Sequence, residues 1–354
     1  MTDVSGRGPV EPGQVAASPP ARDRVAPRSA VQREFRLVSA VRRIAASPSW
    51  RFGLAALGSG MLLAAVYAGF VLSRPGQRLE NMALMGAQLR GPTGREESLT
   101  YLSQVTVLTF ALALIGIAAI AFARRRPGLG VLVAGVMGGS TVVAEVLKDV
   151  LPRPELLTGP AWILRNDFPS GTATIAAALG VGALLVAPDR LRWFVLPVGA
   201  LCAAIIGQST QITGWHRLSG ALGGVLLVMA FAAAALFVLG RVGLVQPTTL
   251  GRVHPKLRAA LLLVPAVAFV IAVAAVVLLV GFPILQVPEN ADAVFLHTVS
   301  ELLGFGFTIV AFVAFASVIE PFSFGRSARR PATEPAAGGL PAPDVAGRGS
   351  DEVE

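Results

Sequence analysis

Apolar residues lie along this chain in long, nearly uninterrupted blocks. A block of about 20 residues has the length that an α-helix needs to cross a hydrocarbon core about 30 Å thick. Eight such blocks can be counted, at residues 52–73, 100–123, 128–147, 171–188, 193–213, 219–240, 258–281 and 293–318. The pattern therefore predicts an all-α fold, a polytopic membrane bundle of about eight transmembrane helices.

The segments between and beyond these blocks divide the chain into four parts. Residues 1–45 form a basic tail that is rich in Pro, Gly, Ala and Arg and is predicted to be largely disordered. Within it, residues 33–45 carry apolar side chains at helical spacing and form either a helix on the membrane surface or an extension of the first span. Residues 50–240 hold six spans, residues 241–318 hold two more, and residues 319–354 form a second disordered tail.

The charge of the chain bears on its partners and on the orientation of the spans in the membrane. The net charge of +9 would suit a nucleic-acid partner, but the basic residues lie in the tails and in short loops, where membrane topology accounts for them. We therefore expect the membrane bilayer as a partner and no nucleic acid. Arg outnumbers Lys by 28 to 2, a bias typical of a GC-rich bacterial genome.

Counting Lys and Arg on alternate sides of the spans predicts the orientation. If the N-terminus is cytoplasmic, 22 of these residues fall on the cytoplasmic side and 8 on the opposite side. This predicts a multi-pass protein of a bacterial plasma membrane with both termini in the cytoplasm. The loops 74–99, 148–170 and 214–218 then share the outer face, so any site that they form is extracytoplasmic.

The loop after the third span leads into a helix start that suits an anion. Lys148, Arg153 and Arg165 precede a Pro-Ser-Gly corner in which Ser170 is a predicted helix cap. A helix N-terminus presents unpaired N–H groups and a partial positive charge, and nearby cations complete a phosphate pocket. The alternative is that the corner only starts a helix while the cations reach the lipid headgroups.

The loop between the fifth and sixth spans contains His216 beside Trp215. A neutral imidazole can attack phosphorus and form a covalent phosphoenzyme, which splits a difficult hydrolysis into two easier steps. The alternative is an interfacial histidine that lies with the tryptophan at headgroup level. Spacing alone favours the interfacial histidine.

Taken together, these segments resemble the type-2 phosphatidic acid phosphatase family of integral-membrane lipid phosphatases. The family has the motifs Lys-x6-Arg-Pro, Pro-Ser-Gly-His and Ser-Arg-x5-His-x3-Asp. This chain has KDVLPRP at 148–154, PSGT at 169–172 and STQITGWHRLSG at 209–220. The resemblance covers about residues 50–240. It implies a six-helix phosphatase-like core, a reaction without metal or cofactor, and a phosphorylated lipid or isoprenoid (di)phosphate as partner.

The resemblance also assigns roles to individual residues. It implies that Lys148, Arg153, Ser170 and the backbone of Gly171 bind phosphate, with His216 as the candidate nucleophile. Four family positions are degenerate. An Arg of the first motif, the general-acid His, a phosphate-binding Arg and the Asp that orients the nucleophile are replaced by Glu155, Thr172, Thr210 and Gly220, respectively.

These replacements decide which activity we expect. Losing a general acid typically costs ~10²–10⁴ in rate, and spoiling an orienting carboxylate can cost ~10⁴. We therefore expect a lipid-phosphatase-like protein that binds its phosphorylated lipid with impaired or lost hydrolysis. The alternative is an active phosphomonoesterase that hydrolyses phosphatidic acid or isoprenyl diphosphate through a phosphohistidine at His216. In that case a displaced acid would be Asp149, Glu155 or Asp167, and Arg217 could supply the missing cation.

Three further pairs are expected to have structural roles. Gly220 and Gly224 form a G-x3-G step that favours close helix packing. Glu145 lies one turn before Lys148 and is expected to pair with it. His297 and Glu301 are four residues apart on one helical face, so we expect a hydrogen-bonded pair, with a proton relay as the alternative.

Overall fold

The computed structural model describes residues 49–91, 94–247, 289–319 and 321–324. These residues belong to one compact unit, Ser47–Glu354. The predicted N-terminal tail, the predicted span at 258–281 and most of the predicted C-terminal tail lie outside the described residues.

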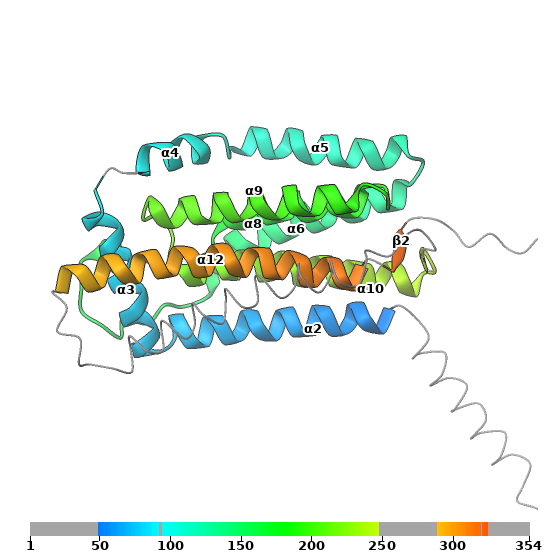
Figure 1. The fold of residues 1–354 in the computed structure, drawn as a ribbon. Coiled ribbons are helices and arrows are strands. Elements are labelled where there is room, and N and C mark those ends of the chain that lie inside the picture. Colours follow the sequence, from blue (N-terminus) through cyan, green and yellow to red (C-terminus); the bar gives the residue numbers. More distant parts are fainter. Residues whose placement is uncertain (1–48, 92–93, 248–288, 320, 325–354) are drawn as a thin grey trace, which may run out of the picture. The chain divides into compact units, whose positions relative to one another are not determined.

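The described chain is almost entirely helical, as the apolar blocks predict (Figure 1). In chain order its elements are α2 (Ser49–Val66), the π-helical turn η1 (Tyr67–Val71), α3 (Arg74–Leu89), α4 (Arg95–Ser103), α5 (Val107–Ala123), α6 (Pro127–Val150), α7 (Ala161–Leu164), α8 (Gly171–Val186), α9 (Arg192–Ile212), α10 (Leu218–Arg241), β1 (Val245–Pro247), α12 (Glu289–Ile319) and β2 (Phe322–Phe324). The short antiparallel pair β1–β2 is the one departure from the all-α prediction among these elements.

Five described helices are long and apolar enough to cross a membrane, so the chain has the character of an all-α membrane protein. They are α2 with η1, α6, α9, α10 and α12. The predicted span at 100–123 is instead two helices, α4 and α5, bent by 56° at a short break, and together they could make a sixth. The break occurs where Thr106 caps α5 through a capping box. The predicted span at 171–188 is a shorter apolar helix of 16 residues, α8.

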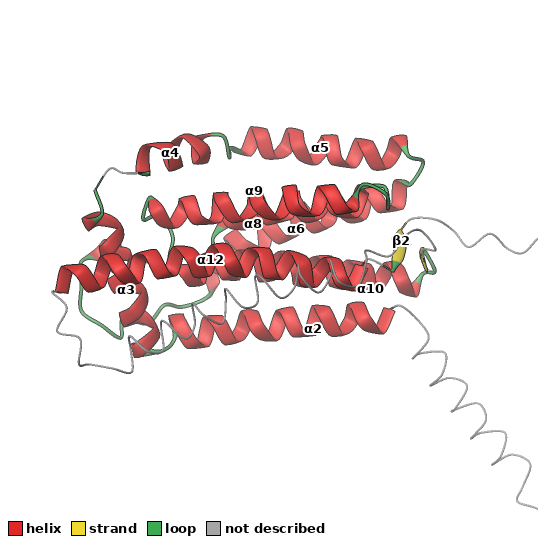
Figure 2. Cartoon of the chain, in the orientation of Figure 1, coloured by secondary structure: helices red, strands yellow, loops and turns green. Residues whose placement is uncertain are grey.

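Helix α10 is the centre of the packing (Figure 2). It contacts α2, α6, α8 and α12, and 67% of its apolar window is buried, more than in any other candidate span of the described chain. Large apolar side chains on the outward faces of α2, α5 and α9 remain exposed, among them Leu57, Leu108 and Trp193. A lipid environment accounts for such faces, because hydrocarbon does not penalise exposed apolar surface.

Glycines allow α10 to approach α8 closely, as the G-x3-G step predicts. A Cβ added at Gly224 would lie 2.8 Å from Thr174 Oγ1 and 2.9 Å from the carbonyl oxygen of Ser170. A Cβ at Gly220 would lie 3.1 Å from the carbonyl oxygen of Asp167. The Gly220 carbonyl in turn accepts a hydrogen bond of 2.9 Å from the Ser170 N–H. The starts of α8 and α10 are therefore fixed against each other.

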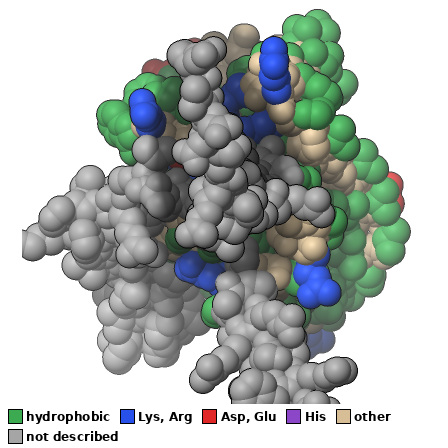
Figure 3. Space-filling view, turned by 90° about the vertical axis from the view of Figure 1, so that its right-hand side faces the viewer, with side chains coloured by type: hydrophobic (Ala, Val, Ile, Leu, Met, Phe, Trp, Pro, Cys, Tyr) green, Lys and Arg blue, Asp and Glu red, His purple; other side chains and the backbone are tan. Residues whose placement is uncertain are grey.

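Arginines hold β2 to one end of the long helices. Arg126 and Arg192 donate to the carbonyl oxygens of Phe324 and Phe322, at 2.8 and 2.6 Å. The Arg192 guanidinium also lies 4.8 Å from the ring centre of Phe324. Figure 3 looks at this end and shows Lys and Arg side chains around its described part. Arginines that the sequence assigns to the cytoplasmic side therefore also fix local structure.

The loops that were predicted to share one face do converge. Helix α3 lies within the predicted loop 74–99 and crosses the ends of the long helices (left in Figure 1). It packs mainly against α12, and a Cβ added at Gly86 would overlap the carbonyl oxygen of Ala293. Arg153, in the loop before α8, forms an ion pair with Glu80 of α3. The loop before α10 is joined to the loop before α8 by the Arg217–Asp167 pair, so both loops lie at this same end.

The contact at Gly224 predicts a specific loss of stability. Gly224→Ala should destabilise the protein by about 1–3 kcal/mol, because the new methyl group meets backbone on α8 and overpacks the helix pair. Thermal unfolding of the detergent-solubilised protein measures this change. Gly135→Ala in α6 is the control, since no atom lies within 4 Å of its added Cβ. Equal melting temperatures for the two variants would contradict the packing role.

Candidate functional site

The start of α8 has the predicted cap. Ser170 is completely buried, and its hydroxyl accepts a hydrogen bond of 3.2 Å from the Ala173 N–H. Its carbonyl receives the Thr174 N–H and hydroxyl, at 3.0 and 2.7 Å. The Ser170 hydroxyl is thus engaged in capping α8. Side chains from outside the helix contact its first turn at Gly171 instead.

An internal carboxylate lies at this helix start. Lys148 Nζ donates to both carboxylate oxygens of Glu145 at 2.8 Å, so the predicted pair is present. A Cβ added at Gly171 would overlap Glu145 Oε1 and would lie 3.1 Å from Lys148 Nζ. The Glu145 side chain is 58% exposed, whereas that of Lys148 is 23% exposed. A carboxylate and an ammonium group therefore occupy the place where the sequence predicts a phosphate.

Asp167 and Arg217 form a buried ion pair that joins the loops before α8 and α10. Arg217 Nη1 lies 2.7 Å from Asp167 Oδ1, and the Arg217 N–H donates to Oδ2 at 2.9 Å. The guanidinium also donates to the carbonyls of Ile163 and Arg165. Burial by itself raises the pKa of Asp167, but Arg217 and His216 outweigh it, so the pKa lies below its ordinary value. Asp167 is thus ionised, which does not fit the displaced-acid hypothesis, and Arg217 is not available as the missing phosphate ligand.

His216 lies beside the same carboxylate. Its Nδ1 is 3.8 Å from Asp167 Oδ2, too far for a hydrogen bond, and its side chain is 13% exposed. Its backbone N–H donates to the Thr210 carbonyl at 3.0 Å, which fixes the loop. Burial lowers the pKa of His216 more than Asp167 raises it, and Lys148 lowers it further. The imidazole is therefore neutral near pH 7, the state that a nucleophile requires.

Arg153 pairs with a carboxylate of α3. Its Nη1 lies 3.6 Å from Glu80 Oε2, and its Nη2 donates to Asn81 Oδ1 at 3.3 Å. Both charged side chains are almost completely buried, at 3% and 2% exposed. Glu80 Oε1 also accepts a hydrogen bond of 2.8 Å from the Ser219 N–H in the first turn of α10. Burial and the charge of Asp167 nevertheless raise the pKa of Glu80 above its ordinary value.

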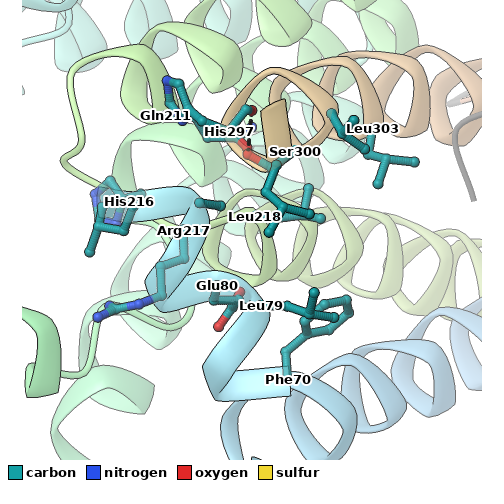
Figure 4. Close-up of a pocket in the computed structure, with 14 residues that line it drawn as sticks. Phe70, Leu79, Glu80, Gln211, His216, Arg217, Leu218, His297, Ser300 and Leu303 are labelled. Carbon is teal, nitrogen blue, oxygen red and sulfur yellow. Dashed lines mark hydrogen bonds between the residues drawn. The ribbon is translucent and has the colours of Figure 1, made fainter. Parts of the chain in front are cut away.

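A cavity of about 100 Å³ opens between α3, α12 and the loop that precedes α10 (Figure 4). Its polar lining consists of Glu80, Gln211, His216, Arg217, His297 and Ser300. Leucine, valine, alanine and phenylalanine side chains make up the remainder. Glu80 and His216, which are far apart in the sequence, therefore face one space.

The four degenerate positions have different surroundings. Thr210 is completely buried and its hydroxyl donates to the Gly207 carbonyl at 2.7 Å, within its own helix. Gly220 packs against Ser170, where the missing carboxylate would not fit without displacing backbone. Glu155 is exposed, and Thr172 is half-buried. Lys148 thus lies at the Gly171 helix start, and its charge acts on His216, whereas Arg153 and Ser170 are engaged in other contacts.

The predicted pair in α12 has a third member. His297 Nε2 and Arg90 Nη1 each lie 2.7 Å from Glu301 Oε1. His297 and Glu301 are buried, and Arg90 is the residue that ends α3. The group ties α12 to α3, which supports the structural interpretation of the pair.

Sequence reasoning missed two features of the site. It treated 74–99 as a loop and did not single out Glu80. Helix α3 does have a visible signal, because Ser73 and Pro75 mark a helix start and apolar residues recur along one face. It also considered Asp167 only as an acid, whereas the structure places its carboxylate 3.8 Å from His216 Nδ1 and in an ion pair with Arg217.

Comparisons with protein-family models, with characterised proteins and with solved structures found no match. Within the described residues, no group of three or more His, Cys, Asp or Glu side chains is arranged to hold a metal ion. A function for this chain therefore has to be inferred from the geometry of the site itself.

The Asp167–Arg217 pair predicts a large and pH-dependent loss on substitution. Asp167→Asn should destabilise the protein by about 3–5 kcal/mol near pH 7, because a buried guanidinium loses its counter-charge. Since the pKa of Asp167 is depressed in the folded state, its contribution is complete above the ordinary value of about 4 and is lost as the pH falls through the folded value. The difference in free energy of unfolding between Asp167→Asn and the parent protein should therefore become smaller at acidic pH.

Thermal unfolding between about pH 3 and pH 8 measures this difference. Asp149→Asn is the matched control, because Asp149 is an exposed aspartate in the last turn of α6, the helix that precedes the loop with Asp167. A loss of stability that does not change with pH, or an equal loss in the control, would contradict the assigned role.

Proposed function

We propose that this chain is a membrane-embedded relative of the lipid phosphatases that binds a phosphorylated lipid or isoprenoid (di)phosphate without turning it over efficiently. The phosphate binds at the start of α8, against Gly171 and Lys148, and the apolar chains extend along the helices. The distribution of Lys and Arg favours an extracytoplasmic position for this end, in a bacterial plasma membrane, with cytoplasmic termini.

The observation that carries the proposal is the position of Glu145. Its carboxylate lies against Gly171 and is held by Lys148, so the fold already accommodates an anion at this helix start. The pair is partly exposed, and exposed pairs are typically worth about 0–1 kcal/mol. A phosphate carries more charge and more acceptor oxygens than a carboxylate, so it can replace Glu145 at low cost.

The same contacts argue against efficient hydrolysis. Arg153 and Arg217 are buried in ion pairs with Glu80 and Asp167, so their charges are already neutralised within the chain. The resemblance puts Thr172 at the position of the family's general acid, and a threonine hydroxyl does not titrate near neutral pH. A bound phosphate therefore lacks both the charge neutralisation and the proton donor that the transition state requires.

A second candidate function is supported by two carboxylates. Asp167 lies 3.8 Å from His216 and takes the place of the orienting Asp that Gly220 cannot supply. Glu80 has a raised pKa and lines the cavity that His216 also lines, so it is a candidate proton donor. An active phosphomonoesterase would use these two residues in place of the family's Asp and His.

Phosphate release and lipid binding separate the two candidates. The experiment uses the full chain in lipid nanodiscs, with phosphatidic acid and an isoprenyl diphosphate as probes. We expect saturable binding and release of phosphate no faster than in His216→Ala. Lys148→Ala should abolish binding, whereas Arg190→Ala, an exposed cation in the loop before α9, should leave it unchanged. Release that disappears in both His216→Ala and Glu80→Gln would favour the enzyme.

Glu145 provides a sharper prediction about binding. Glu145→Gln should bind phosphatidic acid about 3- to 10-fold more tightly, because the competing carboxylate at Gly171 is removed. Isothermal titration or a fluorescent lipid displacement assay measures the change. Glu155→Gln is the matched control, since it removes the same charge from an exposed position in the loop after α6. Equal affinities for the two variants would show that Glu145 does not compete for the site.

A further inference from the structure

The cavity between α3 and α12 has a buried amide without a hydrogen bond to any residue that the structure describes. Gln211, at the end of α9, is 2% exposed, and neither its Nε2 nor its Oε1 has a hydrogen-bond partner among the described residues. Both atoms belong to a residue that lines the cavity (Figure 4). A buried donor and acceptor left unpaired cost free energy, so this amide is suited to a ligand that can donate and accept together.

The charges around the cavity are already balanced within the chain. Glu80 faces Arg153, Arg217 faces Asp167, and a third carboxylate, Glu301, is held by Arg90 and His297. Each buried carboxylate therefore has a cation of its own. A charged ligand would have no counter-charge here and would have to lose its hydration, so the cavity favours an uncharged polar group.

The remaining wall is apolar and reaches the surface. Leu84, Leu218 and Leu303 are buried, whereas Phe70, Leu79 and Leu296 are half-buried. Because one water needs about 10–15 Å³, a cavity of about 100 Å³ has room for a polar group and the first few carbons of a chain. The rest of such a chain would leave past the half-buried side chains.

We propose that this cavity binds the hydroxyl end of a neutral lipid, a long-chain alcohol or an acylglycerol, through the amide of Gln211. One hydroxyl group satisfies the amide because it donates to Oε1 and accepts from Nε2. The apolar wall holds the first part of the chain. This site differs from the helix start at Gly171 and does not depend on phosphate binding there.

Photo-crosslinking tests the proposal directly. The full chain in nanodiscs is labelled with a long-chain alcohol that carries a diazirine near its hydroxyl group, and the labelled peptides are identified by mass spectrometry. We expect labels in α3, around Gln211 and in α12. Oleyl alcohol should compete, whereas 1-octadecene, which has the same chain length and no hydroxyl, should not. Competition by both compounds, or labels elsewhere only, would overturn the proposal.

Substitutions test the role of the amide. Gln211→Leu should reduce labelling about ten-fold, as expected for a lost hydrogen bond in a buried site. Gln208→Leu is the matched control, one turn earlier in α9 and outside the cavity lining. Without lipid, Gln211→Leu should melt at the same or a higher temperature than the parent, because it removes an unpaired polar group. Equal labelling in the two leucine variants would overturn the proposal.

A second variant and a second lipid complete the design. Gly304→Ala should also reduce labelling, because its Cβ would overlap Gln211 Nε2 and push the amide from its position. Excess phosphatidic acid should leave labelling unchanged, since its phosphate binds elsewhere or not at all. Displacement of the alcohol by phosphatidic acid would instead place the phosphate in this cavity and contradict a separate neutral-lipid site.

Discussion

The ion pair between Asp167 and Arg217 fixes the end of the bundle on which every functional inference depends. It joins the segment that leads into α8 to the residue that caps α10, and both partners are buried. Two charges can be removed from water at tolerable cost only when they satisfy each other and their remaining hydrogen bonds. Here the backbone N–H of Arg217 and the carbonyls of Ile163 and Arg165 supply most of those bonds, and only the Arg217 Nε–H has no partner among the described residues. The positions of His216 and of the helix start at Gly171 follow from this junction.

Carboxylates of the chain occupy the helix starts at this end. Asp167 and Glu80 accept the first N–H groups of α10, and Glu145 lies at the first turn of α8. This arrangement follows from the helix dipole, since a helix start attracts negative charge wherever it comes from. The three carboxylates differ in exposure, however. The two at α10 are buried with arginines and are fixed parts of the fold, whereas Glu145 is exposed beside a lysine, which is why we propose that another anion replaces it there.

The features that local sequence determines were predicted, and those that depend on distant contacts were not. Span positions follow from the length of apolar blocks, and the Glu145–Lys148 pair and the Gly220–Gly224 step follow from helical spacing. The bend between α4 and α5 was missed because its capping threonine lies inside an apolar block. Glu80 was missed because its partners, Arg153 and Ser219, lie far along the chain, the second 139 residues away, and no periodicity reports such a contact. Contacts of Asp167 with the residues before α10 were hidden for the same reason.

The two proposed sites differ in the charge that they can accept, and charge is also what distinguishes a lipid phosphate from the corresponding alcohol. At Gly171 a cation is shared with an exposed carboxylate, so an incoming anion finds a positive charge that it can take over. In the cavity each cation is committed to a buried carboxylate, so only a neutral group avoids an uncompensated charge. His216 belongs to both surroundings, because its ring lines the cavity and the charge of Lys148 lowers its pKa. A neutral imidazole at this boundary adds no charge to the balanced ion pairs of the cavity, whereas protonation would add a positive charge there. If both proposed sites exist, the charge of the His216 ring therefore affects how well they separate a phosphorylated lipid from a neutral one.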